Sequence, residues 1–361
     1  MKRNSITVLA ILLATTAIAQ KRDPLVNESQ GVFTVKDPKF FQEEKLTPEG
    51  KRLLQTAREE FAAVRNPTFT IVANKILNLG PDAALGIEGT PVLDTKKALE
   101  NLNRSRSRLR ELKEKLEPQM PDIYRLVMDP ALKAKLSGLD CDWNTSILTP
   151  VKSQGSCGSC WAFAAAATFE HTYKKIYRSS ANLDLSEQHL LDCAKKCSDG
   201  KDAGDCPNGG WSDICFDYMT CNGVASERDK PYSSVEKACS NVRTSYGAFG
   251  WYQVLQANGD WPTREQIKAH IRSFGAVVTY IRVNSAFRAY GGGIFNGAPS
   301  NFERKLNHAV TIVGWCDDKN AWIIKNSWGD DWGPYGGYAY VDYGNVNIGR
   351  YIYVVLPKQN L

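Results

Sequence analysis

The run Gln154-Gly-Ser-Cys-Gly-Ser-Cys-Trp-Ala-Phe163 places Cys160 immediately before a stretch that favours a helix. The residues that follow are mostly alanine, with Phe163 and Phe169 among them, and alanine has the highest helix propensity of the amino acids. Cys160 is therefore predicted at the N-terminal end of a helix, where backbone N–H groups and the helix dipole stabilise a thiolate. The sequence indicates a reactive thiol at this position.

A thiolate nucleophile needs a partner that can carry a proton, and the chain supplies His308 and Asn326. His308 opens one β-branched run and Asn326 follows another, with a predicted hairpin turn at Cys316–Asn320 between them. If this hairpin is in register, His308 and Asn326 lie directly opposite on one face, with Cβ atoms about 4.5–5.5 Å apart. The asparagine oxygen could then accept the imidazole N–H and orient the ring.

These three segments resemble the papain family of cysteine proteases, which includes the lysosomal cathepsins. The resemblance extends roughly from Asp142 to Gly349. It implies an α+β fold in which a helical half, about 148–247, faces an antiparallel, barrel-like β half, about 248–350, across a cleft that holds the active site. The sequence patterns agree with this order, because helical periodicity before Gly247 gives way to β-rich runs after it.

The resemblance also implies catalytic roles. Cys160 would be the nucleophile that forms a thioester with the substrate, His308 the acid–base, and Asn326 the group that orients His308. The Gln154 side chain and the Cys160 backbone N–H would stabilise the oxyanion. The implied activity is that of a thiol endopeptidase, since the segment between Cys239 and Ala276 has no room for a long histidine-bearing insertion that caps the cleft in cathepsin B.

Two other classes of function stay open at this point. A catalytically inactive homologue that acts as a binding or inhibitory protein would be expected to lack a member of the constellation, yet all four residues are present. The protein could also act mainly as an inhibitor through its N-terminal segment. A turnover assay with a peptide substrate on acid-treated protein discriminates these hypotheses.

Substrate contacts are implied by the same resemblance. The Asn208-Gly-Gly run matches a segment that pairs with extended substrate backbone, and Trp328 matches a tryptophan that shields the His–Asn hydrogen bond. Tyr280 and Tyr353 match the wall and floor of the pocket for the substrate side chain two residues before the cut; alternatively their rings point into the core. The expected substrate-binding residues are Asn208, Gly209, Gly210, Trp211, Tyr280, Asn307, Trp328, Trp332 and Tyr353.

The chain divides into an expected signal peptide (1–19), propeptide (20–137) and peptidase (138–361). Lys2 and Arg3 precede an apolar run that ends in small residues, as in a secretory signal, and this run is too short for a membrane span. We expect a secreted or lysosomal protein without a membrane span. Its glycosylation sequons begin at Asn27, Asn103 and Asn144.

The segment before residue 138 carries helical patterns. Thr47-Pro-Glu49 predicts a helix start, with Leu53, Leu54, Ala57, Phe61 and Val64 facing inward before Pro67. A second helix is expected near Lys96–Glu117, with leucine at 102, 109 and 116. By resemblance this segment is a propeptide that inhibits its own peptidase, although its residues depart from the family's usual propeptide pattern. The other expected partners are protein or peptide substrates and cystatin-like inhibitors, and the expected state is a monomer.

The net charge of +6 does not indicate a nucleic-acid partner. The basic excess lies entirely before Gly138, and basic and acidic residues balance after it. A nucleic-acid footprint would persist in the working domain. We expect no nucleic acid, metal or other cofactor.

The ten cysteines divide into pairs implied by the resemblance and a remainder. Cys157 with Cys206 and Cys193 with Cys239 match two family disulfides, and the third has no counterpart in the β half. Without Cys160, an odd number remains, so at least one is free or pairs between chains. We hypothesise a Cys197–Cys221 pair that pins an insertion at 194–205, with Cys215 a buried free thiol. The remaining residues are Cys141, Cys197, Cys215, Cys221 and Cys316.

Overall fold

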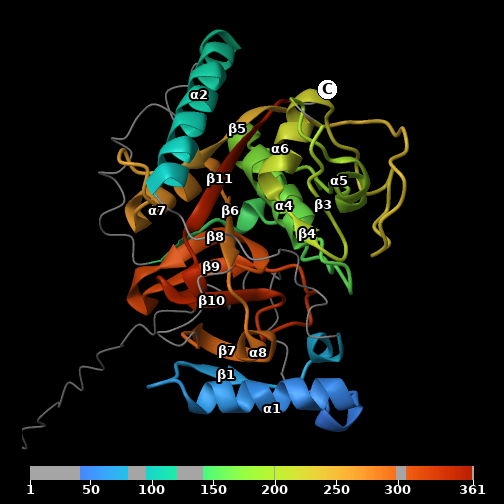
Figure 1. Cartoon of the computed structure of the whole chain (residues 1–361), viewed down its shortest axis with the longest axis vertical. Helices are drawn as coiled ribbons and strands as arrows, with labels where there is room; N and C mark the ends of the chain where they lie inside the picture. The colour runs from blue at the N-terminus through green and yellow to red at the C-terminus, as the bar shows by residue number, and fades with distance from the viewer. Residues whose placement is uncertain (1–40, 80–94, 120–140, 199, 298–305, 360–361) are drawn as a thin grey trace, which may run out of the picture.

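The computed structural model describes residues 41–79, 95–119, 141–198, 200–297 and 306–359 (Figure 1). The expected signal peptide and the sequon at Asn27 lie outside these residues. The division between propeptide and peptidase at residues 137 and 138 also falls outside them. We refer to residues 141–359 as the core domain and to residues 41–119 as the N-terminal segment.

The helical half is built around α4 (Cys160–Tyr177), with α5 (Glu187–Cys193) and α6 (Ser212–Cys221) beside it (Figure 1). Helix α4 begins at Cys160, as the alanine-rich stretch predicted. Its small side chains allow close approach on several sides, and Trp161 and Phe169 are fully buried. The helix therefore occupies the centre of the molecule and presents its first turn to the β half.

The β half is one mixed sheet, in the order β1-β7-β10-β9-β8-β6-β11-β5, with β2 paired to β8. Neighbouring strands are antiparallel except β7 and β10, which are parallel. Among the described residues this sheet is not a closed barrel, and the expected α+β arrangement of a helical half facing a β half is confirmed. The core-domain strands of this sheet are β2 (Cys141–Trp143), β5 (Ala248–Val254), β6 (Val277–Ile281), β7 (Tyr290–Phe295), β8 (His308–Cys316), β9 (Ala321–Lys325), β10 (Tyr338–Asp342) and β11 (Arg350–Pro357).

Shorter elements complete the core domain. Helix α7 (Arg264–Phe274) starts with a capping box, in which Thr263 and Gln266 each bond the other's backbone N–H. Helix α8 (Ser285–Arg288) precedes β7. The remaining elements are the β3–β4 pair (Gly204–Asp205 and Gly209–Gly210) and the 3₁₀ turns η5 (Thr145–Ile147), η6 (Asp317–Lys319) and η7 (Asn345–Asn347).

The β8–β9 hairpin forms where the sequence predicted it, but its register differs from the prediction. The difference begins at the turn, where Cys316 pairs with Ala321, and a β-bulge between Ile312 and Gly314 then inserts one extra residue into β8. Beyond the bulge Thr311 pairs with Lys325, which brings Asn326 level with Val310 instead of His308. The expectation of directly opposite residues is therefore wrong. Because alternate residues share a face, His308 and Asn326 are still diagonal neighbours on the same side of the sheet.

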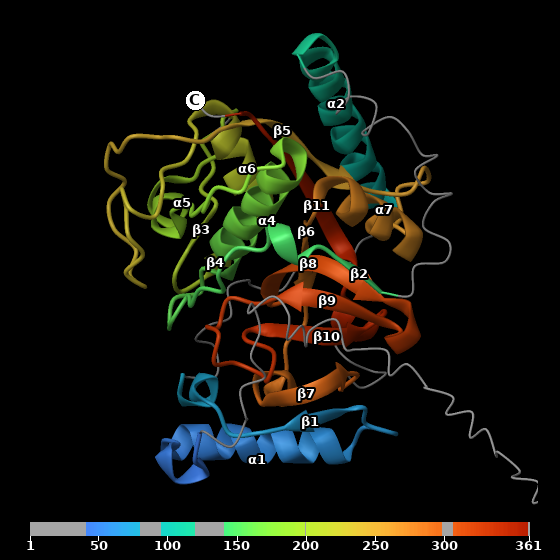
Figure 2. The ribbon, with the colours of Figure 1, turned by 180° about the vertical axis from the view of Figure 1, so that it is seen from behind.

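The N-terminal segment contacts the core domain at two distant places. Helix α1 (Pro48–Ala62) starts at Thr47, whose side chain caps Gly50 N–H, and packs on α8. Strand β1 (Phe69–Ile71) adds to the sheet beside β7, and η3 (Lys75–Asn78) follows it, while η2 (Glu43–Lys45) precedes α1. Helix α2 (Thr95–Gln119) lies at the other end of the molecule, against β5 (Figures 1 and 2).

The inward faces of these two helices agree in part with the prediction. In α1, Leu53, Leu54 and Ala57 are buried, while Phe61 and the following Val64 are only partly buried. In α2 the buried leucines are Leu112 and Leu116, with Leu109 partly buried.

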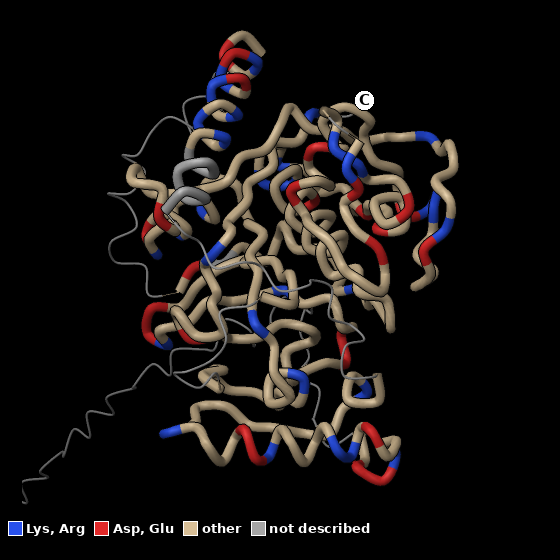
Figure 3. The backbone as a smooth tube through the Cα atoms, in the orientation of Figure 1, with Lys and Arg blue, Asp and Glu red and all other residues tan. Residues whose placement is uncertain are grey.

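Helix α2 is held by charge and aromatic contacts. Arg108 pairs with Asp217 at 3.0 Å, and its guanidinium lies 3.8 Å from the centre of the Trp251 ring. The Ser105 hydroxyl donates to the Gln253 carbonyl at 2.6 Å. Lys, Arg, Asp and Glu residues are frequent on α2 and sparse along the sheet (Figure 3).

Four disulfides link the described residues. Cys157–Cys206 and Cys193–Cys239 correspond to the two family pairs, and Cys197–Cys221 to the hypothesised third. The fourth, Cys141–Cys316, joins β2 to β8 and was not predicted. Cys215 is buried and outside any disulfide, as hypothesised. No helix within the described ranges is long and apolar enough to cross a membrane.

Candidate active site

The two halves bring Cys160 and His308 together. Cys160 lies in the first turn of α4 and takes part in no disulfide. His308 is the first residue of β8, and the backbone N–H of Ala309 donates to Cys160 Sγ at 3.2 Å. The thiol is therefore next to the backbone that carries the His308 ring. Both side chains are fully buried.

The hydrogen bonds of Asn326 determine which His308 nitrogen carries hydrogen. Ser327 N–H donates to Asn326 Oδ1 at 2.8 Å, which identifies this atom as an acceptor. His308 Nε2 lies 2.8 Å from the same oxygen and must therefore be the protonated nitrogen of the neutral ring. His308 Nδ1 has no hydrogen-bond partner among the described residues. It is left with a lone pair that can accept a proton.

Aromatic rings cover the His308–Asn326 bond. The Trp328 ring stacks on His308 with centroids 4.7 Å apart, and the edge of Trp332 meets Trp328 at 5.2 Å. Phe287 packs against both tryptophans. Since Trp328 and Trp332 are each only 1% exposed, water is kept from the bond. Exclusion of water strengthens a hydrogen bond and fixes the ring plane.

Burial lowers the pKa of His308 to about 4, with a further contribution from the nearby charge of Arg288, while the bond to Asn326 acts in the opposite direction. The ring is therefore neutral near pH 7 in the described state unless an anion stabilises its charged form. A thiolate at Cys160 would be such an anion, and the two groups would then titrate as a pair.

Gln154 is fixed beside the start of α4. Its side-chain amide donates to the Cys157 carbonyl at 2.9 Å and accepts from the Ser327 hydroxyl at 2.6 Å. Its backbone N–H donates to the Ser327 carbonyl at 2.9 Å. Gln154 thereby links the turn before Cys160 to the segment after Asn326.

The Asn208-Gly-Gly run makes its close contacts within the helical half. Gly209 adopts a positive φ of 71°, and a Cβ on Gly210 would lie 2.2 Å from the Ala203 carbonyl oxygen. Only glycine permits this approach. The Asn208 amide donates to Asp205 at 2.8 Å. Close packing within the protein therefore explains why glycine occupies these positions. A contact of this run with bound substrate is a proposal.

Tyr280 and Tyr353 are both buried in the described state, which favours the alternative that their rings point into the core. Tyr280 is 0% and Tyr353 6% exposed. The Tyr280 hydroxyl accepts from Ser212 N–H at 2.9 Å, and the two rings meet edge to face at 6.1 Å. The Tyr280 ring can be buried in the core because the backbone N–H of Ser212 forms a hydrogen bond with its hydroxyl oxygen. Trp211 packs on Tyr280 and stays partly exposed.

Two further expected substrate residues are structural in this state. Asn307 forms a pair of hydrogen bonds with the backbone of Val283, at 2.7 and 3.1 Å, and so fixes the chain just before His308. Trp332 lies beneath Trp328 and donates to the Arg288 carbonyl at 3.1 Å. A bound peptide has no access to either side chain without rearrangement.

A buried charged cluster behind the site was not predicted. Lys325, the residue before Asn326, donates to the Thr149 hydroxyl at 2.8 Å, and Thr149 donates to Glu170 at 2.5 Å. Lys152 pairs with Glu187 at 2.8 Å. Burial lowers the pKa of Lys325 to about 8. Charged residues within otherwise apolar runs were the only sequence signal for this cluster. No group of metal-binding side chains occurs in the described part of the chain.

Comparisons with known proteins identify the family. A sequence profile described as "Papain family cysteine protease" matches residues 138–356. The chain belongs to the papain family. A cysteine protease from Blomia tropicalis is 36% identical over 214 residues, covering 58% of this chain and 62% of the relative. Cathepsin L from Sarcophaga peregrina is 33% identical over 201 residues, covering 54% and 56%. The matches thus span only part of either relative's length.

Solved structures of papain-family proteins share the fold. Procathepsin L2 from Tenebrio molitor superimposes with a TM-score of 0.63 at 23% identity, covering 85% of this chain and 91% of the other. The bromelain protease from Ananas comosus, solved with the E64 inhibitor, gives 0.51 at 30% identity, covering 60% and 99%. The first of these likenesses includes residues outside the family match.

Proposed function

We propose that this protein is a thiol endopeptidase made as a latent precursor in the secretory pathway. The observation that carries the proposal is the fixed His308–Asn326 bond, with Cys160 Sγ held at the backbone beside His308. Neither a structural thiol nor a core histidine requires this arrangement. Family membership gives the proposal its reaction class.

The chemistry follows from the positions of the proton carriers. His308 Nδ1 would take the Cys160 proton, and the thiolate would attack the substrate carbonyl carbon to form a tetrahedral oxyanion. The imidazolium would then give its proton to the amide nitrogen as the C–N bond breaks, leaving a thioester. Water, losing a proton to His308, would attack the thioester and release the acid and the thiol.

The Gln154 amide is suited to stabilise the oxyanion. Its oxygen is engaged by Ser327 and one N–H by Cys157, so the orientation of the whole amide is fixed. The Gln154 amide, with the backbone N–H of Cys160, would donate to the developing negative charge. Such donors act without reorganisation during the reaction.

The proposal is tested by turnover of an internal, end-blocked peptide by acid-treated protein. We expect cleavage that a thiol-directed epoxide inhibitor abolishes. If folded, acid-treated protein binds peptides but never cleaves them, the chain is an inactive homologue that acts by binding. Inhibition of another peptidase by the untreated protein would instead identify the N-terminal segment as the functional part.

The N-terminal segment would keep the precursor inactive. Its β1 strand completes the sheet beside β7, and Asn74 donates to the Arg288 carbonyl at 2.7 Å, the same carbonyl that Trp332 bonds. This contact places the segment next to the aromatic cover of His308.

Self-processing near Lys135–Asp142 is expected to accelerate below about pH 5, and two carboxyls of the segment should respond in opposite directions. The bond from Arg58 lowers the pKa of Glu43; this contact joins η2 to α1 within the segment, so the segment's own fold is stabilised above pH about 4.5 and loses this support in acid. Burial raises the pKa of Glu60, whose carboxylate accepts from Ala286 N–H. By linkage, Glu60 favours docking in acid and less so as pH rises.

Glu60→Gln should therefore slow self-processing at pH 7 relative to wild type, and the difference should vanish toward pH 4.5. Gels of the precursor over time, with N-terminal sequencing of the product, measure both rates. A precursor that is fully active at neutral pH without cleavage contradicts the latency proposal. A Glu60→Gln effect confined to acid contradicts the assigned direction.

Substrate selection should depend on Tyr280. By resemblance Tyr280 would stand at the wall of the pocket for the side chain two residues before the cut, and its buried ring would shorten that pocket, so we expect small aliphatic or polar residues to be preferred over Phe there. Tyr280→Ala should raise kcat/KM for Phe relative to Val by roughly 10- to 100-fold. Tyr280→Phe keeps the ring and should keep the preference. A wild-type enzyme that cleaves a substrate library best with Phe at that position shows the pocket to be open.

A further inference from the structure

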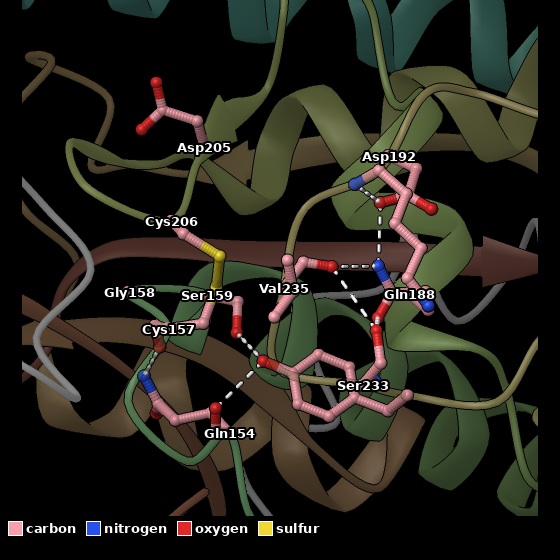
Figure 4. The surroundings of a disulfide bond; sticks show 12 residues. Gln154, Cys157, Gly158, Ser159, Gln188, Asp192, Asp205, Cys206, Ser233 and Val235 are labelled. Atoms are coloured by element: carbon pink, nitrogen blue, oxygen red, sulfur yellow. Dashed lines mark hydrogen bonds between the residues drawn. A yellow bond between two sulfur atoms is a disulfide. The ribbon is translucent and has the colours of Figure 1, made fainter.

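One tyrosine hydroxyl connects the two sides of the proposed oxyanion site. The Tyr232 hydroxyl donates to the Gln154 carbonyl at 2.9 Å and lies 2.6 Å from the Ser159 hydroxyl. Since a phenol has one hydrogen and a carbonyl only accepts, Ser159 must donate to Tyr232. Figure 4 shows these bonds around the labelled residues Gln154 and Ser159.

The Ser159 side chain does not make the helix-capping hydrogen bond that is usual at its position. It is the N-cap residue of α4, a position where serine normally accepts a hydrogen bond from the first turn. Here its side chain makes no such bond, although Ser159 is completely buried. The hydroxyl next to Cys160 is thus directed to Tyr232 instead of to its own helix.

The Tyr232 ring is itself held on several sides. It meets Phe163, one turn into α4, edge to face at 4.8 Å. The next residue, Ser233, donates its N–H to Gln188 Oε1 at 2.9 Å, and Gln188 donates to Asp192 at 2.7 Å and to the Val235 carbonyl at 2.8 Å. The loop that carries Tyr232 is therefore fastened to α5 (Figure 4).

The bridge remains intact at any working pH. Burial raises the pKa of Tyr232 to about 12, so the hydroxyl keeps its proton. The Cys157–Cys206 disulfide fixes the other side of the same turn, where the Cys157 carbonyl accepts from the Gln154 amide at 2.9 Å.

We propose that Tyr232 is a positioning residue that sets the distance between the Gln154 amide and the Cys160 backbone N–H, and so tunes oxyanion stabilisation. This inference rests on the proposed function. Tyr232 would not touch substrate. It would fix the Gln154 backbone to the residue that begins the nucleophile's helix.

The test compares acid-activated wild-type enzyme with Tyr232→Phe, which keeps the ring and its contact with Phe163. We expect kcat for a peptide substrate to fall about 3- to 10-fold, the effect of one neutral hydrogen bond, with KM unchanged. A peptide aldehyde, whose adduct with the thiol is tetrahedral, should bind more weakly by the same factor. Alkylation of Cys160 by iodoacetamide forms no oxyanion and should keep its rate and pH profile.

Ser159→Ala removes the hydroxyl at the other end of the bridge, and it removes no helix-capping bond. We expect the same fall in kcat and the same weaker aldehyde binding. This variant keeps the test informative if Tyr232→Phe misfolds. Tyr246→Phe is the matched control, because its ring packs on Phe169 and Tyr173 in the same half. It should leave kcat unchanged. In a Gln154→Ala background, where we expect a loss of roughly 10²-fold, Tyr232→Phe should cost little more.

The outcomes separate this inference from the proposed function. Wild-type kcat in both Tyr232→Phe and Ser159→Ala, with activity still lost in Gln154→Ala, overturns the positioning role alone. Slower alkylation in proportion to kcat also overturns it, since the hydroxyl would then act on the thiolate. Full activity in Gln154→Ala removes the oxyanion assignment and this inference together, while loss of activity in Cys160→Ser would still support a thiol peptidase.

Discussion

Replacing Cys160 with serine is expected to lower kcat/KM for peptide hydrolysis by at least about 10³-fold, with the fold and the four disulfides intact. A serine hydroxyl is a far weaker acid than a thiol, and a neutral imidazole whose pKa burial has lowered to about 4 is a poor base for it. The helix terminus that favours a thiolate does little for an alkoxide at neutral pH. Steady-state hydrolysis of an end-blocked peptide measures the loss.

Covalent labelling gives the same assignment without turnover. A thiol-directed epoxide should modify Cys160 alone, as read by peptide mapping. The matched control is Cys215→Ala, since Cys215 is the other cysteine in the described residues outside a disulfide, and burial raises the pKa of its thiol well above the usual value. Labelling at Cys215 or Cys157 with Cys160 unmodified contradicts the nucleophile assignment.

The second large effect is expected at His308. In His308→Gln the amide nitrogen can still donate to Asn326, but nothing replaces Nδ1 as a base, so kcat should fall by roughly 10³- to 10⁴-fold. The alkylation of Cys160 should change as well. Without the imidazolium, the thiolate is expected to form only near the ordinary thiol pKa of about 8.5, so the reaction at pH 5–6 should disappear.

His270→Gln is the control for this change. His270 lies on α7, away from Cys160, and its Nδ1 is 2.6 Å from the Gln266 carbonyl of its own helix. It should leave both the rate and the alkylation profile unchanged. If His308→Gln still reacts with iodoacetamide at pH 5–6 as wild type does, the thiolate depends on the helix terminus alone and the proposed pair is wrong.

Local signals predicted much of the site, because single elements place its main residues. The alanine run fixed the start of α4 at Cys160, and the β-branched runs placed His308 and Asn326 on adjacent strands. The register was not predictable from the turn residues, since Cys316 pairs with Ala321, and the lone glycine of β8, Gly314, was the one local signal for the β-bulge beside it. The bulge shifts the register by one residue, from that of the Gly314–Ile323 pair to that of the Ile312–Ile324 pair, and so returns His308 and Asn326 to the same face.

The failures concern contacts between distant parts of the chain. Strand β2 is three residues long and too short to give a periodic signal, so the Cys141–Cys316 pair was left open. The burial of Tyr280 depends on Ser212 N–H, a partner in another element. Tyr232 was missed for the same reason, because nothing local reveals that its hydroxyl meets Gln154 and Ser159.

The two separate attachments of the N-terminal segment make it a bivalent ligand of its own core domain. Each attachment, at β7 and at β5, raises the effective concentration of the other for as long as residues 80–94 connect them. One cut in that connection would divide a tightly held ligand into two weakly held pieces, while the contacts that α1, β1 and α2 make with the core domain would all remain. Release would then be a sharp, nearly irreversible event set by a single peptide bond.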